Sequence, residues 1–154
     1  MRWKKFLRRS KFCRGFTLVE TMVTLSVIGV AATASVGVYQ ALRSGTDLKI
    51  AAATVAEALY QAESRAQAVA GDSPWGARVD QAAVTIFRGS AYASRAAQDD
   101  IILSLPSTIA ITDPAEINFK KFTGLPTSAA IFTLTNSGQA SRLVGISALG
   151  VINY

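Results

Sequence analysis

The chain falls into three stretches that differ in how apolar and polar positions follow one another. Residues 16–39 are an almost unbroken apolar run, in which Glu20 is the one side chain charged at neutral pH. As a helix, this run would reach about 36 Å, and roughly 20 mostly apolar residues suffice to cross a bilayer core. The pattern predicts a membrane-spanning helix, and a buried helix of a soluble protein is the alternative.

In residues 40–70, apolar side chains recur at alternating spacings of three and four, which places them on one face of a helix. These positions are Leu48, Ala52, Val55, Leu59, Ala62, Ala66 and Val69. We therefore expect one helix from about Phe16 to Ala70, with residues 40–70 as an amphipathic continuation of the first part. Gly71, followed by Asp72, Ser73 and Pro74, is expected to end it.

Residues 71–154 consist of short β-type runs between turn residues. The predicted strands are 76–80, 83–88, 101–105, 109–111, 116–120, 130–135, 141–146 and 151–154. Their spacing predicts two small antiparallel sheets packed on the apolar face of the helix. The expected fold class is α+β, with a long N-terminal helix and an antiparallel β head.

The positive charge of the chain is concentrated at its start. Seven of the 16 basic residues lie within residues 1–15, which hold no acid. They are Arg2, Lys4, Lys5, Arg8, Arg9, Lys11 and Arg14. Basic flanks stay on the cytoplasmic side of a membrane, so we expect a single-pass protein with its N-terminus inside and residues from about Gln40 outside. In residues 16–154, nine basic and ten acidic side chains nearly cancel, which gives no support for nucleic-acid binding.

Two other export signals fit this start less well. Ala31 to Ser35 could imitate a secretory cleavage site, but the helical pattern runs on through it. A lipoprotein cysteine would follow the apolar run, whereas Cys13 precedes it.

Glu20 is costly inside a membrane span, and such residues are usually functional. If the chain is cut between Gly15 and Phe16, the new α-amine lies four peptide units from Glu20 and becomes its natural cationic partner. The alternative is a Glu20 side chain that only reaches the cytoplasmic interface.

The run Arg14-Gly15-Phe16-Thr17-Leu18-Val19-Glu20 resembles the class III signal of type IV pilins and pseudopilins. The resemblance implies a cleaved leader, residues 1–15, removed by prepilin peptidase, and N-methylation of Phe16. It implies that Glu20 guides packing of residues 16–39 against other pilin or pseudopilin subunits, with Gly29 and Gly37 loosening the helix. It also implies residence in the bacterial inner membrane, contact with an inner-membrane assembly platform, and then incorporation into a filament.

The head is similar to the H-type pseudopilins of type II secretion (GspH) and to FimT minor pilins. The similarity rests on the segments 75–79 and 85–92, on Ile117-Asn118-Phe119, and on Gly124-Leu125-Pro126. It implies a minor pseudopilin or pilin-like structural subunit. The alternative is a DNA-uptake or adhesive minor pilin that binds a ligand through its head, although the region that would hold basic residues offers only Arg142.

No catalytic, cofactor-binding or metal site is expected, and no enzymatic activity. The chain has no histidine, and residues 16–154 contain no cysteine, which excludes serine–histidine and cysteine–histidine arrangements. Acidic residues that could imitate a carboxylate pair or a calcium loop are Asp99, Asp100, Asp113 and Glu116, which we interpret as solvated loop residues. Lys120 and Lys121 are interpreted as a solvated strand end, and Trp75 as a packing anchor between helix and sheet.

Overall fold

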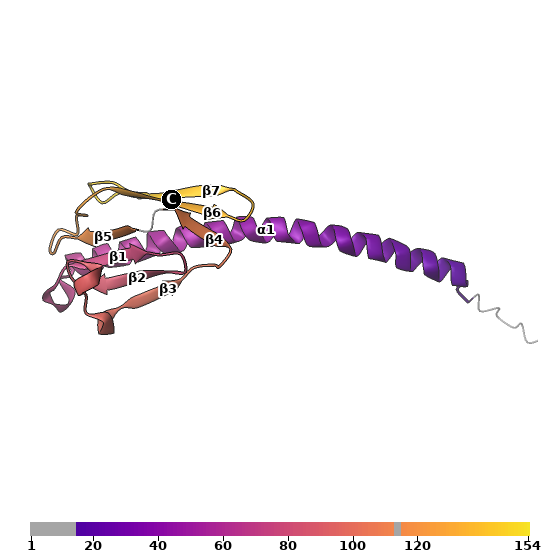
Figure 1. Ribbon diagram of the computed structural model, residues 1–154, viewed down its shortest axis with the longest axis horizontal. Coiled ribbons are helices and arrows are strands. Elements are labelled where there is room, and N and C mark those ends of the chain that lie inside the picture. The colour runs from indigo at the N-terminus through magenta and orange to yellow at the C-terminus, as the bar shows by residue number, and fades with distance from the viewer. Residues whose placement is uncertain (1–14, 113–114) are drawn as a thin grey trace, which may run out of the picture. The chain divides into compact units, whose positions relative to one another are not determined.

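The computed structural model describes residues 15–112 and 115–154. The chain divides between Val38 and Tyr39 into two compact units. A single helix, α1 (Leu18–Gln67), begins in the first unit and ends in the second (Figure 1).

In the first unit, Gly15, Phe16 and Thr17 precede α1 without regular structure. The apolar side chains of the following helical turns are exposed: Leu18, Val19, Met22, Val23, Leu25, Val27, Ile28, Val30 and Val38. Within the described residues, α1 is the one helix long and apolar enough to cross a membrane, and its apolar window is not buried by the protein.

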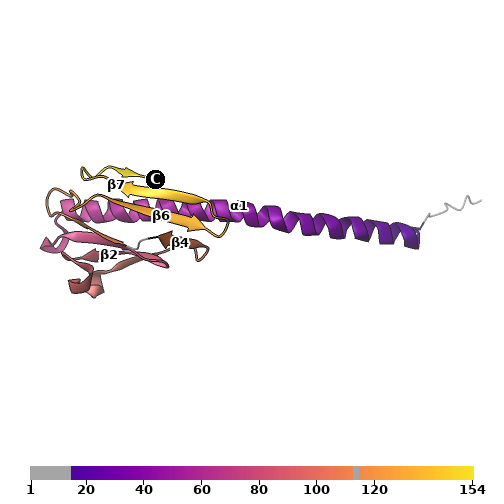
Figure 2. The ribbon, with the colours of Figure 1, turned by 45° about the horizontal axis from the view of Figure 1, so that its top comes forward.

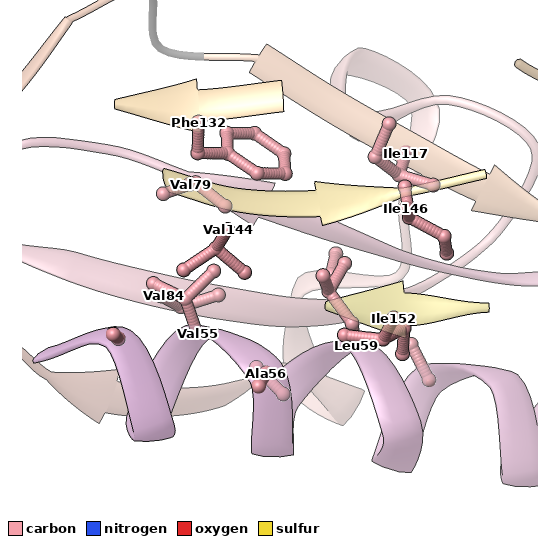
Figure 3. Packing of buried hydrophobic residues seen from close by; sticks show 14 of the residues in the cluster. Val55, Ala56, Leu59, Val79, Val84, Ile117, Phe132, Val144, Ile146 and Ile152 are labelled. Carbon is pink, nitrogen blue, oxygen red and sulfur yellow. The ribbon is translucent and has the colours of Figure 1, made fainter. Parts of the chain in front are cut away.

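In the second unit, α1 buries the face that its periodicity predicts. The buried residues are Leu48, Ala52, Val55, Leu59, Ala62 and Ala66, joined by Ala51, Ala56 and Ala58. The many alanines favour helix and leave room for close packing of the strands. Figure 3 shows Val55 and Leu59 of α1 on the side that faces Val84, Val144 and Ile152.

The end of the helix differs from the prediction. The helix stops at Gln67 rather than Ala70, and Val69 lies outside it in a left-handed conformation with φ 54°. A short 3₁₀ turn, η1 (Ala70–Asp72), follows. The carbonyl oxygen of Ala66 accepts hydrogen bonds from the Val69 N–H and from the Phe122 N–H, each at 3.2 Å, so a distant loop helps to satisfy the helix terminus.

The α+β prediction is confirmed, and the two predicted antiparallel sheets are present. The first has the order β3-β2-β1-β5 and the second the order β4-β6-β7-β8. The strands are β1 (Trp75–Val79), β2 (Ala83–Arg88), β3 (Ile101–Ser104), β4 (Ile109–Thr112), β5 (Ala115–Phe119), β6 (Ala130–Asn136), β7 (Ser141–Ile146) and β8 (Ile152–Asn153). Figure 2 shows β6 and β7 lying along the second part of α1.

Two features tie this unit together beyond the strand ladders. The Gln81 side-chain amide pairs with the backbone of Ile111: its Oε1 accepts from the Ile111 N–H at 3.0 Å, and its Nε2 donates to the Ile111 carbonyl oxygen. The β1–β2 turn thus contacts the edge of the second sheet.

On β2, Thr85 and Phe87 are buried as well as Val84 and Ile86. The 89–98 connection covers this face through an edge contact between the Phe87 and Tyr92 rings, whose centroids are 5.5 Å apart.

Candidate processing and assembly site

The peptide bond between Gly15 and Phe16 lies outside regular structure. Both residues are exposed, and the Phe16 side chain is 79% accessible. A Cβ placed on Gly15 would meet no atom within 4 Å. The bond that the resemblance predicts to be cleaved is therefore exposed.

Thr17 caps the helix that begins directly after it. The Glu20 N–H donates to Thr17 Oγ1 at 3.2 Å, and the Thr21 N–H donates to the Thr17 carbonyl oxygen at 3.2 Å. This is N-cap geometry, and Thr17 with Glu20 has the spacing of a capping box. Sequence reasoning did not single out Thr17, although the pattern of Thr followed three residues later by Glu would have predicted the cap.

Glu20 lies in the first turn of α1 and is exposed. A carboxylate at this place interacts favourably with the positive end of the helix dipole. In the part of the chain that the structure describes, no salt bridge reaches Glu20. In this uncleaved chain the nitrogen of Phe16 is an amide, so an amine becomes available to Glu20 only once the leader is removed.

Several hydroxyl groups of the apolar helix donate hydrogen bonds within the helix. Thr21 donates to the Leu18 carbonyl at 2.8 Å, Thr24 to that of Glu20 at 2.9 Å, and Ser26 to that of Met22 at 2.8 Å. Internal satisfaction of polar groups is what a lipid environment demands. These threonines and serines are therefore compatible with membrane anchoring.

Gly29 and Gly37 both lie within α1, which continues through them without a break. A Cβ at either position would meet no neighbouring atom within 4 Å. Their predicted effect on helix flexibility stays a prediction.

Two of the acidic residues of the head that could imitate a metal or catalytic site pair with basic groups. Asp99 Oδ2 lies 3.0 Å from Arg88 Nη1, and Asp100 Oδ2 accepts from Arg95 Nε at 2.7 Å, a bond that raises the pKa of the Arg95 guanidinium. Asp113 lies outside the described residues.

Glu116 is also used by the fold. It accepts hydrogen bonds from the Tyr92 N–H and from Asn118 Nδ2, each at 3.3 Å. Over residues 15–112 and 115–154, no three acidic residues come together as a metal cluster.

The remaining candidate residues differ in their surroundings. Trp75 is 6% exposed, donates from Nε1 to the Ala70 carbonyl at 2.8 Å, and lies under the Arg65 guanidinium, as expected of an anchor at the helix-to-sheet junction. Lys121 pairs with Asp72, and the hydrogen bond and charge of Lys121 lower the pKa of that carboxyl. Lys120 is exposed at the end of β5, and Arg142 is half-buried on β7.

Comparison with known proteins adds one match. Residues 10–36 match the family model described as the prokaryotic N-terminal methylation motif. No curated protein and no solved structure matches the chain. The matched segment contains Gly15, Phe16, the Thr17 cap and Glu20, and it leads into the exposed apolar helix. This match supports a type IV pilin-like signal at the start of the chain, and the exposed apolar helix that follows fits membrane anchoring.

Proposed function

We propose that the protein is a minor pseudopilin or pilin-like structural subunit of a type II secretion or type IV pilus filament. Prepilin peptidase cuts between Gly15 and Phe16 and methylates the new Phe16 amine. The single observation that carries the proposal is the methylation motif at residues 10–36, which includes Gly15, Phe16 and the capped first turns of the apolar helix. We propose a structural role and no enzymatic one.

Assembly would follow from the charges and apolar surface at the start of the mature chain. Cleavage places a cation at Phe16, one residue before the Thr17 cap, and Glu20 sits in the first helical turn. When helices move from lipid into a bundle, pairing the amine with Glu20 avoids leaving either charge alone in a dry setting. The exposed apolar side chains of α1 then exchange their contacts with lipid for packing against neighbouring helices.

The basic leader sets the proposed topology. Residues 1–15 remain on the cytoplasmic side of the bacterial inner membrane until cleavage, and the head lies outside. The partners are prepilin peptidase, the inner-membrane assembly platform, and the N-terminal helices of other subunits.

The experiment is a Glu20→Gln substitution followed through three steps. We expect membrane insertion and cleavage to continue, because both precede helix packing. Incorporation into sheared filaments should fall at least about tenfold, since a loss of about 1.4 kcal/mol of pairing free energy corresponds to a factor of ten. Ser26→Ala is the matched control, because it alters a self-satisfied hydroxyl on the same helix. Normal incorporation of the Glu20 variant would refute the assembly mechanism.

A further inference from the structure

One surface of the head is exposed and carries no charge. On each strand of the second sheet, one side buries its residues and the other side is accessible. We call the accessible side the outer β4–β8 face. Its residues are Ala110, Thr112, Ile131, Thr133, Thr135, Ser141, Leu143, Gly145 and Asn153.

This face combines aliphatic side chains with paired hydroxyl groups. Ile131 is 67% exposed and Leu143 is 58% exposed. Thr112 lies opposite Thr133, and Thr135 lies opposite Ser141, in the strand register. The face is thus neutral and mixes aliphatic with hydroxyl side chains.

Charged side chains are scarce throughout the last part of the chain. Residues 122–154 contain one charged side chain, Arg142. Arg142 is opposite the buried Leu134 in the register, so it belongs to the inner side of β7. Every other charged side chain of the protein precedes Phe122.

The other accessible surfaces of the described head differ in this respect. A groove of about 490 Å³ beside α1 is lined by Ile50, Tyr60 and Tyr154, but it also holds Glu57. The first sheet displays Arg78 and Glu116, both partly accessible. Among these surfaces, the outer β4–β8 face is the one that could be covered without desolvating a charge.

Surfaces that stay exposed to solvent usually carry charged side chains of both signs. The cores of stable interfaces, in contrast, are depleted of charge. A partner surface for the outer β4–β8 face must itself lack charges, because a charge brought against it would lose its water without gaining a counter-ion. A second copy of the same face meets that requirement, and two-fold symmetry makes such a contact self-complementary.

We propose that the outer β4–β8 face docks on the same face of a second copy of this chain, sheet against sheet. The spacing would be about 10 Å, as in packed β-sheets. Ile131 and Leu143 would lie in the interface with the threonine hydroxyls between them. This contact uses only the head, so it does not depend on the proposed processing at Gly15.

The test uses cysteine cross-linking of the full chain in membranes, in a Cys13→Ser background that removes its single cysteine. Thr133→Cys, Ile131→Cys and Leu143→Cys each report on the face, and a short bis-maleimide joins cysteines that come close together. Ile102→Cys is the matched control, because Ile102 is 64% exposed on the first sheet. We expect a covalent dimer of twice the chain's mass from at least one reporter and only background from Ile102→Cys. Background levels from all three reporters, or cross-links only to other proteins, would overturn the proposal.

A charge substitution provides the second arm. Leu143→Lys in the Ile131→Cys chain should reduce the dimer at least about tenfold, because two like charges would face each other. Ile102→Lys should leave it unchanged, and unchanged thermal unfolding of both variants shows that the fold is intact. Persistence of the dimer in Leu143→Lys would overturn the proposal. Repeating the measurement with Gly15→Leu, which should block cleavage, separates this contact from the proposed filament function.

Discussion

Asn136, at the end of β6, donates a hydrogen bond from Nδ2 to the carbonyl oxygen of Ser44 on α1, at 3.3 Å. Its Oδ1 accepts from the Gly138 and Ala140 N–H groups at 3.1 and 2.9 Å. One buried amide therefore shapes the β6–β7 turn and fastens it to the helix.

Replacing Asn136 by Leu should destabilise the head. The substitution removes three hydrogen bonds of a residue that is 8% exposed. Leaving such groups unpaired costs about 1–3 kcal/mol each at most, so a loss of about 2–3 kcal/mol in the free energy of unfolding is expected. Chemical denaturation of the detergent-solubilised chain measures it, with the exposed Ser137→Ala as the control. A loss under about 0.5 kcal/mol, the range of ordinary surface substitutions, would show that the amide does not fasten the turn.

Gly76→Ala should be destabilising because there is no room for the new methyl group. A Cβ at Gly76 would lie 2.9 Å from the Ile117 carbonyl oxygen and 2.4 Å from Phe87 Cζ. Overpacking of this kind typically costs about 1–3 kcal/mol. Gly138→Ala is the control, because its nearest atom is 3.5 Å away. Equal melting temperatures for the two variants would contradict the packing described for β1.

Leu59→Ala tests the contact between α1 and the sheets. Leu59 is fully buried, and truncation of a buried leucine costs about 2–5 kcal/mol. Leu149→Ala, at a position that is 80% exposed, should change stability by less than about 0.5 kcal/mol. Thermal unfolding compares them, and a similar small effect for both would mean that the helix does not pack on the sheets as described.

Glu63 provides a pH-dependent prediction. Burial raises the pKa of its carboxyl above the usual 4.5, so the unfolded chain ionises more readily than the folded head. Ionisation of Glu63 therefore disfavours folding at pH values above the raised pKa of the folded head. The penalty disappears as the pH falls below 4.5. Glu63→Gln, which keeps an oxygen to accept from Gln67 Nε2, should stabilise the head at pH 7 and have little effect at acid pH. A pH series of unfolding midpoints checks this, and a stabilisation that grows toward low pH would contradict it.

The sequence predicted the parts of this fold that depend on neighbours along the chain. Strands such as β2 and β6 lie between turn residues, and the buried face of α1 follows from a simple spacing. Val69 fits that spacing but lies beyond the end of the helix, because its backbone is left-handed. The Phe122 N–H, far along the chain, donates a hydrogen bond to the last turn.

The contacts that could not be predicted are the long-range ones. Gln81 pairs with Ile111, and Asn136 reaches Ser44, across 30 and 92 positions of sequence. Neither pairing leaves a periodic signal. The N-terminal site could be recognised from the sequence, because Gly15, Phe16, Thr17 and Glu20 lie within one short segment and their spacing defines the motif.

The proposed assembly depends on a mature protein that begins at Phe16. Intact-mass measurement of the protein from native membranes, with fragmentation of the N-terminal peptide, identifies the first residue. We expect a chain that starts at Phe16 and carries one methyl group on its amine. A chain that still starts at Met1, or one that starts within residues 31–36, would contradict it.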